Sequence, residues 1–451
     1  MYLDSLGSLY KPKSMWTKML DEVKDKEQIG KQVKKSQTNE EMWEQFGFIE
    51  ENNCYVSAGG SKGNREWSNF IMEPLAHVRS MTNSKRLYQI KNKYGMEQTV
   101  ELKQEELVSL AKFRVRVESM GNYLWLATET ELFRLKNYLY LNTETCDEIT
   151  QLGWQRQYGF FAWGNGGVVD GNFIKADDIG ILRIGKNAYY LPAFSKIFAD
   201  EMNLFQFERR FIHAQSSGIS FGEYARKMID VFGDNAVIAI CFLISTMFKD
   251  IIVRITKSYP ILNLFGPKGS GKSEMGHSLM SFFIVKNNPP NLQSTTKAAL
   301  AEAVAQVSNA LVHLDEYKNT LDIDKIEFLK GLWDGTGRDR MNMDRDKKRE
   351  MTRVDSGIIL SGQEMPTADI ALFSRMIFLT FSESTHTKEQ ADRFNELKQI
   401  ESNGLTHITN QILSHRHKME LDFSGSRNLV TEDLRRELDG TPIEDRTLLN
   451  W

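Results

Sequence analysis

The chain has 451 residues, a formal net charge of −3, and 41% hydrophobic and 26% charged residues. This length gives room for two or three domains, and the slightly acidic balance excludes a globally basic nucleic-acid-binding protein, so any such site must be local. Cys54, Cys146 and Cys241 lack paired spacing, which argues against a zinc ribbon or a disulfide framework and is typical of a reducing cytoplasm. No signal peptide opens the chain, and the apolar run at 236–248 is too short for a bilayer. We therefore expect a cytoplasmic protein without membrane contact.

Composition changes along the chain and predicts its organisation. Residues 1–45 are charged, and we expect a helical or poorly ordered N-terminal extension with a solvated face rather than a binding arm. From 46 to 200, short β-prone runs are interrupted by Gly, Asn and Asp, which predicts a mostly β accessory domain. Residues 201–258 have the pattern of a helical segment. The region 386–451 looks helical and charged, and it ends on LLNW, from which we expect a longer natural polypeptide.

An aromatic cluster in the accessory domain allows two interpretations. Tyr158, Phe160, Phe161 and Trp163 could stack on the bases of a single strand. Packing in the core of a small β domain is the favoured interpretation, since large aromatic side chains dominate cores.

The stretch GPKGSGKS, Gly266 to Ser273, matches the pattern G-x-x-x-x-G-K-S between an apolar run and a helical pattern. In that context, backbone amides and a helix N-terminus can cradle phosphates, whereas the alternative is a flexible surface turn. We expect Lys272 to neutralise the β- and γ-phosphates of ATP and the Ser273 hydroxyl to hold Mg²⁺. The full set of expected nucleotide-binding residues is Gly266, Pro267, Lys268, Gly269, Ser270, Gly271, Lys272, Ser273 and Glu274.

A second motif follows downstream, where the apolar run at 310–314 closes with Asp315 and Glu316. A strand that ends in Asp beside such a loop can hold Mg²⁺, and the next Glu can orient and deprotonate the attacking water. Alone, this pair would read as the solvated end of a strand. Downstream of the glycine-rich loop, we expect Asp315 as a metal ligand and Glu316 as the catalytic base.

Two polar residues follow later apolar runs. Gln363 is the first choice, and Ser361 the second, for a side chain that touches the γ-phosphate or the lytic water; the alternative is a strand-capping amide in a turn. Arg375 stands between a short helix and another strand, where it can reach a phosphate bound by a neighbouring subunit. A surface salt bridge is the alternative for Arg375.

Between these motifs lies a charged segment, 338–353, whose β-prone edges predict a hairpin. Its basic side chains could grip a phosphate backbone, although interleaved acids also fit a solvated hairpin. The expected DNA-binding residues are Arg338, Arg340, Arg345, Lys347, Lys348 and Arg349.

The motif order GPKGSGKS, HLDE, basic hairpin, ILSGQ and ALFSRMIFL resembles the superfamily III helicases of the AAA+ class, and more closely the helicase parts of phage and mobile-element primase-helicases. The stretch LGWQRQYGFFAWGNG and its β-rich surroundings resemble the uncharacterised domain that precedes such motors. The resemblance covers about residues 46 to 385 and implies a ring, usually hexameric, that translocates on DNA using ATP. It implies that Gly266 to Ser273 form Walker A, Asp315 and Glu316 Walker B, Gln363 sensor 1, Arg375 the arginine finger, and 338–353 the DNA-gripping hairpin. Gln363 departs from the Asn that is more usual at sensor 1.

The predicted fold class is thus an α/β P-loop NTPase motor of AAA+ type at 259–385, preceded by a mostly β domain and a helical segment, with helical N- and C-terminal extensions. The predicted function is an ATP- and Mg²⁺-dependent DNA helicase or translocase that acts in replication on single-stranded or forked DNA. No primase site is recognisable, so priming would come from another chain or a missing segment. The alternatives are an ATPase that loads or remodels a replication complex without unwinding, or a nucleotide-dependent assembly or packaging module. The residues alone leave DNA and RNA as alternatives.

Overall fold

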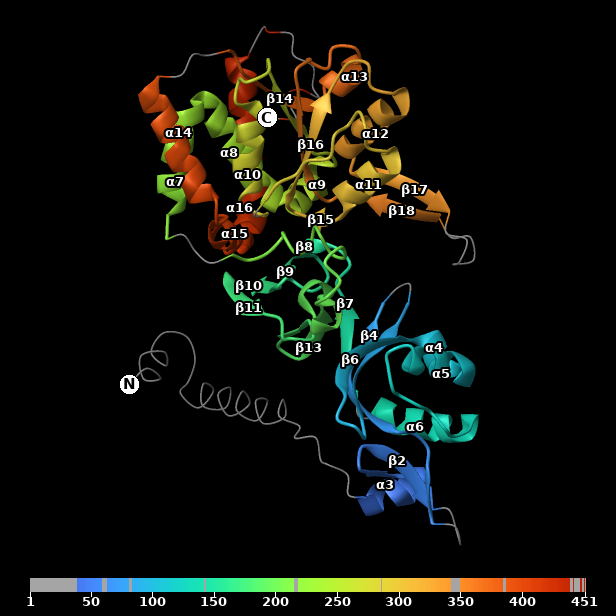
Figure 1. Ribbon diagram of the computed structural model, residues 1–451. Coiled ribbons are helices and arrows are strands. Elements are labelled where there is room, and N and C mark those ends of the chain that lie inside the picture. Colours follow the sequence, from blue (N-terminus) through green and yellow to red (C-terminus); the bar gives the residue numbers. More distant parts are fainter. Residues whose placement is uncertain are drawn as a thin grey trace, which may run out of the picture. The chain divides into compact units, whose positions relative to one another are not determined.

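The chain divides into two compact units, residues 1–148 with 183–190 and residues 149–182 with 191–451. The structure is a computed structural model (Figure 1). It describes residues 39–58, 63–80, 83–141, 143–214, 218–284, 286–341, 349–383, 387–438, 441, 447 and 450.

The first unit contains a three-stranded sheet, β1-β2-β3, and a six-stranded sheet in the order β12-β13-β7-β4-β5-β6. Helices α4, α5 and α6 lie on one side of the curved strands β4 to β6 (Figure 1). Its elements are α3 (Asn39–Phe46), β1 (Ile49–Glu51), β2 (Cys54–Ala58), β3 (Asn64–Glu66), β4 (Phe70–Arg79), β5 (Lys85–Asn92), β6 (Glu97–Lys103), α4 (Gln104–Val108), α5 (Leu110–Glu118), α6 (Glu129–Leu141), β7 (Thr145–Glu148), β12 (Ile181–Ile184) and β13 (Asn187–Tyr190).

The core of the first unit combines aromatic and aliphatic side chains. Trp67, Phe70, Phe113 and Trp125 are buried and pack edge-on or tilted against one another. Strand β4 alternates buried and more exposed positions, as a strand with one face on a core should. The three helices then cover this apolar face, so the expected accessory domain contains more helix than its β-prone runs predicted.

Two expected boundaries differ from the structure. Helix α3 contributes Met42 and Phe46 to the aromatic core, so residues 39–45 belong to the first unit rather than to an extension. Residues 1–38 lie outside the described residues. The range 46–200, expected as one domain, is divided between the two units: 46–148 and 183–190 lie in the first, and 149–182 and 191–200 lie in the second. Local β propensity predicted the strands, but it carries no information about which sheet each strand joins.

The second unit contains the elements β8 (Leu152–Gln155), β9 (Phe160–Trp163), β10 (Gly166–Val169), β11 (Asn172–Lys175), η2 (Pro192–Phe194), η3 (Lys196–Phe198), α7 (Phe221–Phe232), α8 (Asp234–Met247), α9 (Lys249–Thr256), β14 (Ile261–Phe265), α10 (Lys272–Met280), α11 (Lys297–Ala305), β15 (Val307–Ser308), β16 (Leu311–Tyr317), α12 (Ile323–Trp333), β17 (Thr336–Met341), β18 (Arg349–Arg353), β19 (Gly357–Gly362), α13 (Ile370–Phe373), β20 (Met376–Thr380), α14 (Lys388–Glu401), α15 (Thr406–Leu413) and α16 (Arg416–Glu437).

A parallel sheet with the strand order β16-β19-β14-β20 forms the centre of this unit. Its strands are almost entirely buried, which is typical of a parallel sheet covered by helices on both faces. Figure 1 shows α8 and α10 on one side of the sheet and α11 and α12 on the other. Because Phe265 pairs with both Gly362 and Thr380, the carboxyl ends of β14, β19 and β20 share one edge.

A smaller sheet, β11-β10-β9-β8-β15, precedes the parallel sheet and is joined to it. Its last strand, β15, runs parallel to β8, and only two residues separate β15 from β16. A Cβ atom at Gly153 would lie 2.0 Å from the carbonyl oxygen of Ser308, so this close approach requires glycine. Phe160, Phe161 and Trp163 of β9 are buried, which confirms core packing for these three aromatics; Tyr158 is half-buried.

The expected helical segment 201–258 is helical from 221 onward, in α7, α8 and α9, whereas 202–210 form turns. Phe211, directly after these turns, stacks on Phe161 and on Phe283. The expected C-terminal helices are confirmed as α14, α15 and α16. Among the described residues, no single helix is long and apolar enough to cross a bilayer; α8 and α9 together are, but the chain bends by 87° between them.

Candidate nucleotide-binding site

The loop 266–271 connects β14 to α10 at the carboxyl edge of the parallel sheet. Gly269 and Gly271 have φ values of +82° and +88°, in the left-handed region that favours glycine. At Gly266, an added Cβ would lie 2.5 Å from the carbonyl oxygen of Phe381. The glycines predicted from the sequence are thus required by backbone conformation at two positions and by close packing at a third.

Lys272 is the first residue of α10, and its side chain folds back into the loop. Its Nζ donates a hydrogen bond to the carbonyl oxygen of Pro267 at 3.1 Å, and the residue is 8% exposed. The Ser270 hydroxyl donates to the same carbonyl at 2.9 Å. The loop therefore surrounds an ammonium group at the N-terminus of a helix, where both the charge and the helix dipole favour an anion. Ser273 is half-buried on the first turn of α10, and Lys268 is exposed.

Glu274, the last residue of the expected nucleotide-binding set, is engaged elsewhere. Its carboxylate forms an ion pair with Lys398 of α14 at 3.2 Å. Lys398 also donates to the Ser278 hydroxyl and to the Glu401 carboxylate, both at 3.0 Å. These contacts join α14 to α10, and they give Glu274 a packing role beside its predicted one.

Asp315 and Glu316 lie at the same edge of the sheet as the loop. Strand β16 lies beside β19, which lies beside β14, and the pairing of β16 shifts register between Leu314 and Tyr317. Glu316 has a φ of +62° within this irregularity, a conformation that costs a non-glycine residue free energy. The backbone of Asp315 is fixed on its outer side, because its N–H donates to Pro290 at 3.1 Å and its carbonyl accepts from Leu292 at 2.9 Å.

A row of hydrogen bonds reaches the Asp315 carboxylate through the sheet. The Ser361 hydroxyl donates to Asp315 Oδ1, His313 Nε2 contacts Ser361 Oγ at 2.7 Å, and Asn287 Nδ2 contacts His313 Nδ1 at 3.1 Å. Burial lowers the pKa of His313 to about 4, because an imidazolium would lose its hydration there; the Asp315 carboxylate opposes this effect and His277 adds to it. Sequence reasoning missed His313 and Asn287. A histidine two residues before Asp315 in a buried strand is the signal that could have found the first.

Gln363 follows β19 directly and is exposed at the carboxyl edge, beside the loop. Ser361, the second choice, is instead fully buried and bonded to Asp315. Sequence reasoning therefore chose one residue on β19 and one directly after it, and the structure places them in different environments.

Arg375 lies at the opposite edge of the sheet. It immediately precedes β20, whose first residue pairs with the first residue of β14. A five-residue strand spans roughly 15 Å, so Arg375 is separated from the loop of its own subunit by about that length. Its guanidinium donates to the Ala371 carbonyl at 2.5 Å and lies 5.4 Å from the ring centroid of Trp333.

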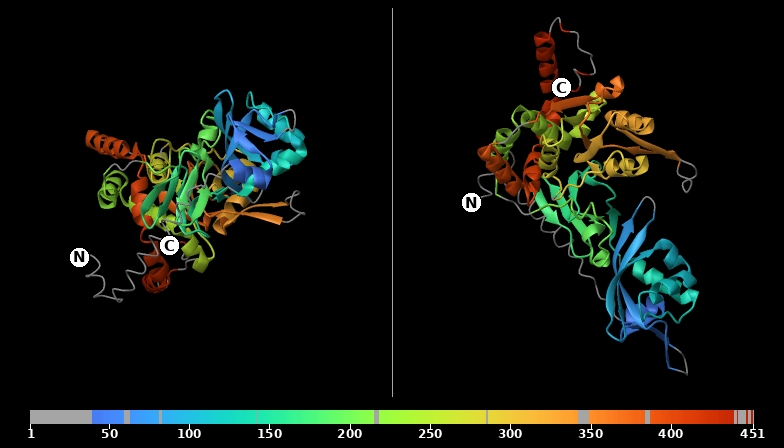
Figure 2. Two further views of the ribbon diagram at one scale, coloured as in Figure 1. Left: turned by 90° about the horizontal axis from the view of Figure 1, so that it is seen from below. Right: turned by 45° about the horizontal axis from the view of Figure 1, so that its top comes forward.

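The predicted hairpin is confirmed as backbone. Strands β17 and β18 pair antiparallel and extend away from the parallel sheet (orange in Figure 2). Arg338 and Arg340 lie in β17, and Arg349 lies in β18. Arg345, Lys347 and Lys348 lie outside the described residues. At the base of the hairpin, buried Lys249 donates to the carbonyls of Val354 at 3.1 Å and Ser356 at 2.6 Å.

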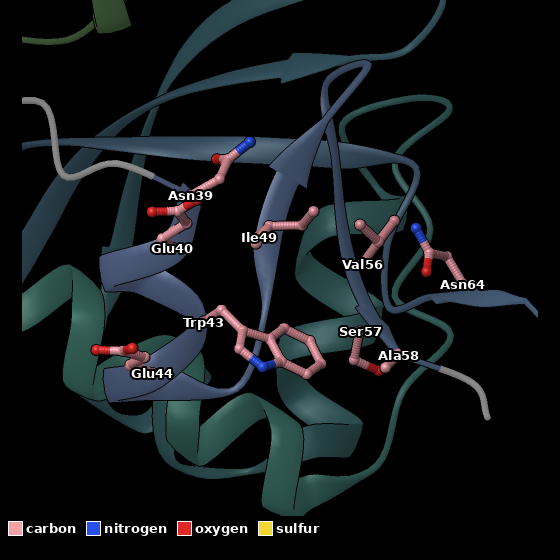
Figure 3. A pocket seen from close by; sticks show the side chains of 9 residues that line it. All are labelled: Asn39, Glu40, Trp43, Glu44, Ile49, Val56, Ser57, Ala58 and Asn64. Carbon is pink, nitrogen blue, oxygen red and sulfur yellow. The ribbon is translucent and has the colours of Figure 1, made fainter.

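The first unit has a surface pocket of its own beside α3 (Figure 3). Trp43 of α3 reaches toward Ser57 and Ala58 at the end of β2, and Glu40 and Glu44 stand on the helical rim. These two carboxylates give that rim a negative charge, which disfavours an anionic ligand. In the described ranges, no group of three or more His, Cys, Asp or Glu side chains is placed to hold a metal ion.

The sheets, the helices and the residues gathered at one sheet edge define a mixed α/β protein. Among solved structures, the SCCmec type IV Cch active helicase matches with a TM-score of 0.54 and 11% identity, over 89% of this chain and 71% of that chain. The chain therefore shares its fold with that helicase. A ligand-bound JCV helicase has a TM-score of 0.29, with 15% identity over 50% of this chain and 66% of that chain. The C-terminal region of NrS-1 in its apo form has a TM-score of 0.31, with 11% identity over 76% and 68%. No family model and no curated protein sequence matches the chain.

Proposed function

We propose that the chain is an ATP-dependent DNA helicase or translocase of a phage or mobile genetic element, which acts in replication as a ring, with six subunits as the expected number. The observation that carries this proposal is the ammonium of Lys272 inside a glycine loop, at the sheet edge where Asp315 and Glu316 also lie. The fold shared with the Cch helicase supports it. The proposal places the protein in the host cytoplasm, with a separate primase chain as its partner.

Each residue at this edge has a distinct task in the proposal. Lys272 and the loop amides hold the phosphates of ATP, and Glu316 accepts a proton from the attacking water. The Ser273 hydroxyl and the Asp315 carboxylate suit Mg²⁺, which prefers oxygen ligands and is commonly held by few protein groups together with phosphates. Mg²⁺, when bound, neutralises negative charge on the phosphates. Gln363, exposed directly after β19, has the task of contacting the terminal phosphate or the water.

The ring is supported by the position of Arg375. An arginine stabilises charge on the γ-phosphate only if it reaches that phosphate. Since Arg375 lies at the sheet edge opposite its own loop, it would serve a neighbouring subunit. The hairpin of β17 and β18 extends away from the sheet, as a DNA-contacting element would.

The test measures ATP hydrolysis with and without single-stranded DNA, and then strand separation on a forked duplex. We expect DNA to stimulate hydrolysis, and Lys272→Ala to abolish it. DNA-stimulated hydrolysis without strand separation would favour a loader or remodeller. ATP hydrolysis that ignores DNA would favour an assembly module, and an absence of ATP binding would overturn the proposal.

The variant Glu316→Gln refines this test. It loses only the carboxylate that handles the water, so it should bind ATP with unchanged affinity while hydrolysis falls by roughly 10²-fold or more. A fluorescent ATP analogue measures binding, and phosphate release measures turnover. Equal turnover in Glu316→Gln and the parent protein would show that another residue is the base.

A further inference from the structure

Four polar residues from separate parts of the second unit form one continuous chain of hydrogen bonds. Asn287 lies in the segment after α10, Ser361 on β19, and His313 and Asp315 two residues apart on β16. The successive contacts are 3.1 Å from Asn287 Nδ2 to His313 Nδ1 and 2.7 Å from His313 Nε2 to Ser361 Oγ, followed by the bond from Ser361 to Asp315. His313 and Ser361 are 1% and 0% exposed, so water does not replace these bonds.

The Asp315 carboxylate fixes which group donates and which accepts in each of these hydrogen bonds. An ionised carboxylate only accepts hydrogen bonds, so the single hydroxyl hydrogen of Ser361 must point to it. Ser361 Oγ must then accept from His313, which requires the hydrogen on Nε2. In a neutral imidazole Nδ1 is then an acceptor, so Asn287 must present its NH₂ group. Every donor along the chain therefore points toward Asp315.

The backbone beside Asn287 holds Asp315 as well. Asp315 exchanges backbone hydrogen bonds with Pro290 and Leu292, in the segment that begins at Asn287. Buried Lys325 of α12 in turn donates to the carbonyl of Leu292 at 2.7 Å. The segment 287–292 therefore supports Asp315 in two ways. Its main chain bonds to the main chain of Asp315, and the Asn287 side chain reaches the Asp315 carboxylate by way of His313 and Ser361.

We propose that Asn287 and His313 are positioning residues, which act through Ser361 to fix the Asp315 carboxylate for magnesium. One carboxylate oxygen, Oδ1, accepts from Ser361, and Oδ2 would then be available as a ligand for the metal. The inference rests on the proposed function, because it assigns a purpose to a metal ligand of that site. Partners that orient a metal ligand typically change metal affinity by roughly 10- to 100-fold when they are removed.

The tautomer of His313 is the first test, and it requires neither nucleotide nor metal. Nitrogen-15 NMR of histidine-labelled full-length protein distinguishes a hydrogen on Nε2 from one on Nδ1. The His313 signal is identified by its loss in His313→Gln. We expect the Nε2–H form at neutral pH. The Nδ1–H form would overturn the proposed hydrogen-bond chain, whether or not the protein binds or hydrolyses ATP.

Metal affinity is the second test, and neighbouring asparagines provide a matched pair. Asn287→Ala removes the first donor from a half-exposed position, whereas Asn288→Ala removes the same group from its exposed neighbour. Ser361→Ala removes the final donor. Manganese binding with ADP, measured by electron paramagnetic resonance, should weaken roughly 10-fold or more in Ser361→Ala and several-fold in Asn287→Ala, but not in Asn288→Ala.

Metal-free ADP affinity separates positioning from a general loss of structure. It should stay within about 2-fold of the parent in all three variants, because the loop that holds the phosphates is untouched. Equal losses of metal-free and metal-dependent binding would indicate a merely structural role and would overturn the proposal. Unchanged manganese binding in Ser361→Ala would overturn it too. If the parent protein binds no ADP at all, the proposed function fails. The NMR result still shows whether His313 donates to Ser361 as the hydrogen-bond chain requires.

Discussion

At the scale of single residues, Gly276 controls how closely α10 approaches β16. A Cβ atom added there would lie 2.6 Å from Cε1 and 3.0 Å from Nδ1 of His313. The ring is held at both nitrogens, so it cannot retreat without breaking a bond that joins it to Asn287 or Ser361. The close packing of α10 on β16 therefore requires glycine at position 276. The hydrogen bonds that connect His313 to Asp315 through Ser361 depend on the same glycine.

Gly276→Ala should destabilise the protein by about 1–3 kcal/mol, because overpacking outweighs the gain of up to roughly 1 kcal/mol in helix propensity. Calorimetry would record a lower melting temperature. Gly425→Ala in α16 is the matched control, since nothing lies within 4 Å of its added Cβ. That variant should be neutral or slightly more stable. A Gly276→Ala protein as stable as Gly425→Ala would show that the sheet adapts to the methyl group.

Lys249 gives the stability of the protein a dependence on pH. Burial lowers its pKa from 10.5 to about 8, with the Asp355 carboxylate opposing the shift. Between these values the unfolded chain binds more protons than the folded one, so the free energy of unfolding rises with pH, by roughly 3 kcal/mol in total. Below pH 8 both states are protonated, and the buried ammonium then costs the folded state this amount.

Urea unfolding of the parent and of Lys249→Met at several pH values between 7 and 10.5 isolates this effect. The difference in unfolding free energy between the two proteins should move in favour of the parent as pH rises through this window. Tyrosine and cysteine ionisation affects both proteins equally. Parallel curves would mean that Lys249 keeps its ordinary pKa.

At the scale of elements, the hairpin of β17 and β18 is where DNA contact is expected. Neutralising Lys347, Lys348 and Arg349 together should weaken DNA binding and flatten its dependence on salt, by about one counterion for each lost phosphate contact. ATP affinity should not change. Binding measured by fluorescence anisotropy at several salt concentrations gives the slope. Neutralising Arg427, Arg435 and Arg436 on α16 controls for the change in net charge. An unchanged salt dependence in the hairpin variant would mean that its basic residues do not contact DNA.

Several strands and helices of the second unit could be predicted from the sequence. The apolar run 261–265 coincides with β14, and the strand before Asp315 and the strand before Gln363 are β16 and β19, because a buried parallel strand has a simple local signature. The helix after the glycine loop was likewise predicted. Glycine conformation and chain order placed the candidate site near one sheet edge.

Features that depend on distant parts of the chain escaped prediction. The support of Asp315 by Pro290, Leu292 and Asn287 requires a segment without regular structure to lie against β16. Hydrophobic periodicity in the sequence does not predict a contact of this kind. The turns at 202–210 were predicted as helix, and Phe211, which follows them, packs on Phe161, a residue remote in sequence. The division of the accessory region between two units was missed for the same reason.

At the scale of the whole molecule, Arg375 tests whether subunits share their sites. If Arg375 acts as an arginine finger, Arg375→Ala should bind ATP almost normally yet hydrolyse it roughly 10³-fold more slowly. Arg375→Lys, which keeps a cation near Trp333, should also be slow if the planar guanidinium is what acts. Mixing Arg375→Ala with Lys272→Ala should restore activity above the sum of the two, because some interfaces then combine an intact loop with an intact finger.

Gel filtration must show that the two variants assemble together before the mixture is interpreted. Given co-assembly, a mixture that stays inactive means that Arg375 works inside its own subunit. The 15 Å or so between Arg375 and its own loop would then have to close by a movement within the subunit.

The pairing of β15 with β8 also has a consequence for synthesis on the ribosome. Gln151, just before β8, donates a hydrogen bond at 2.8 Å to the carbonyl of Ala305, 154 residues later. At translation rates of about 5–20 residues per second, the strand that completes the small sheet emerges roughly 8 to 30 seconds after β8. During that interval β8 offers an open edge that other chains can pair with. Nascent chains that pause before residue 307 are therefore the species in which aggregation through β8 should begin.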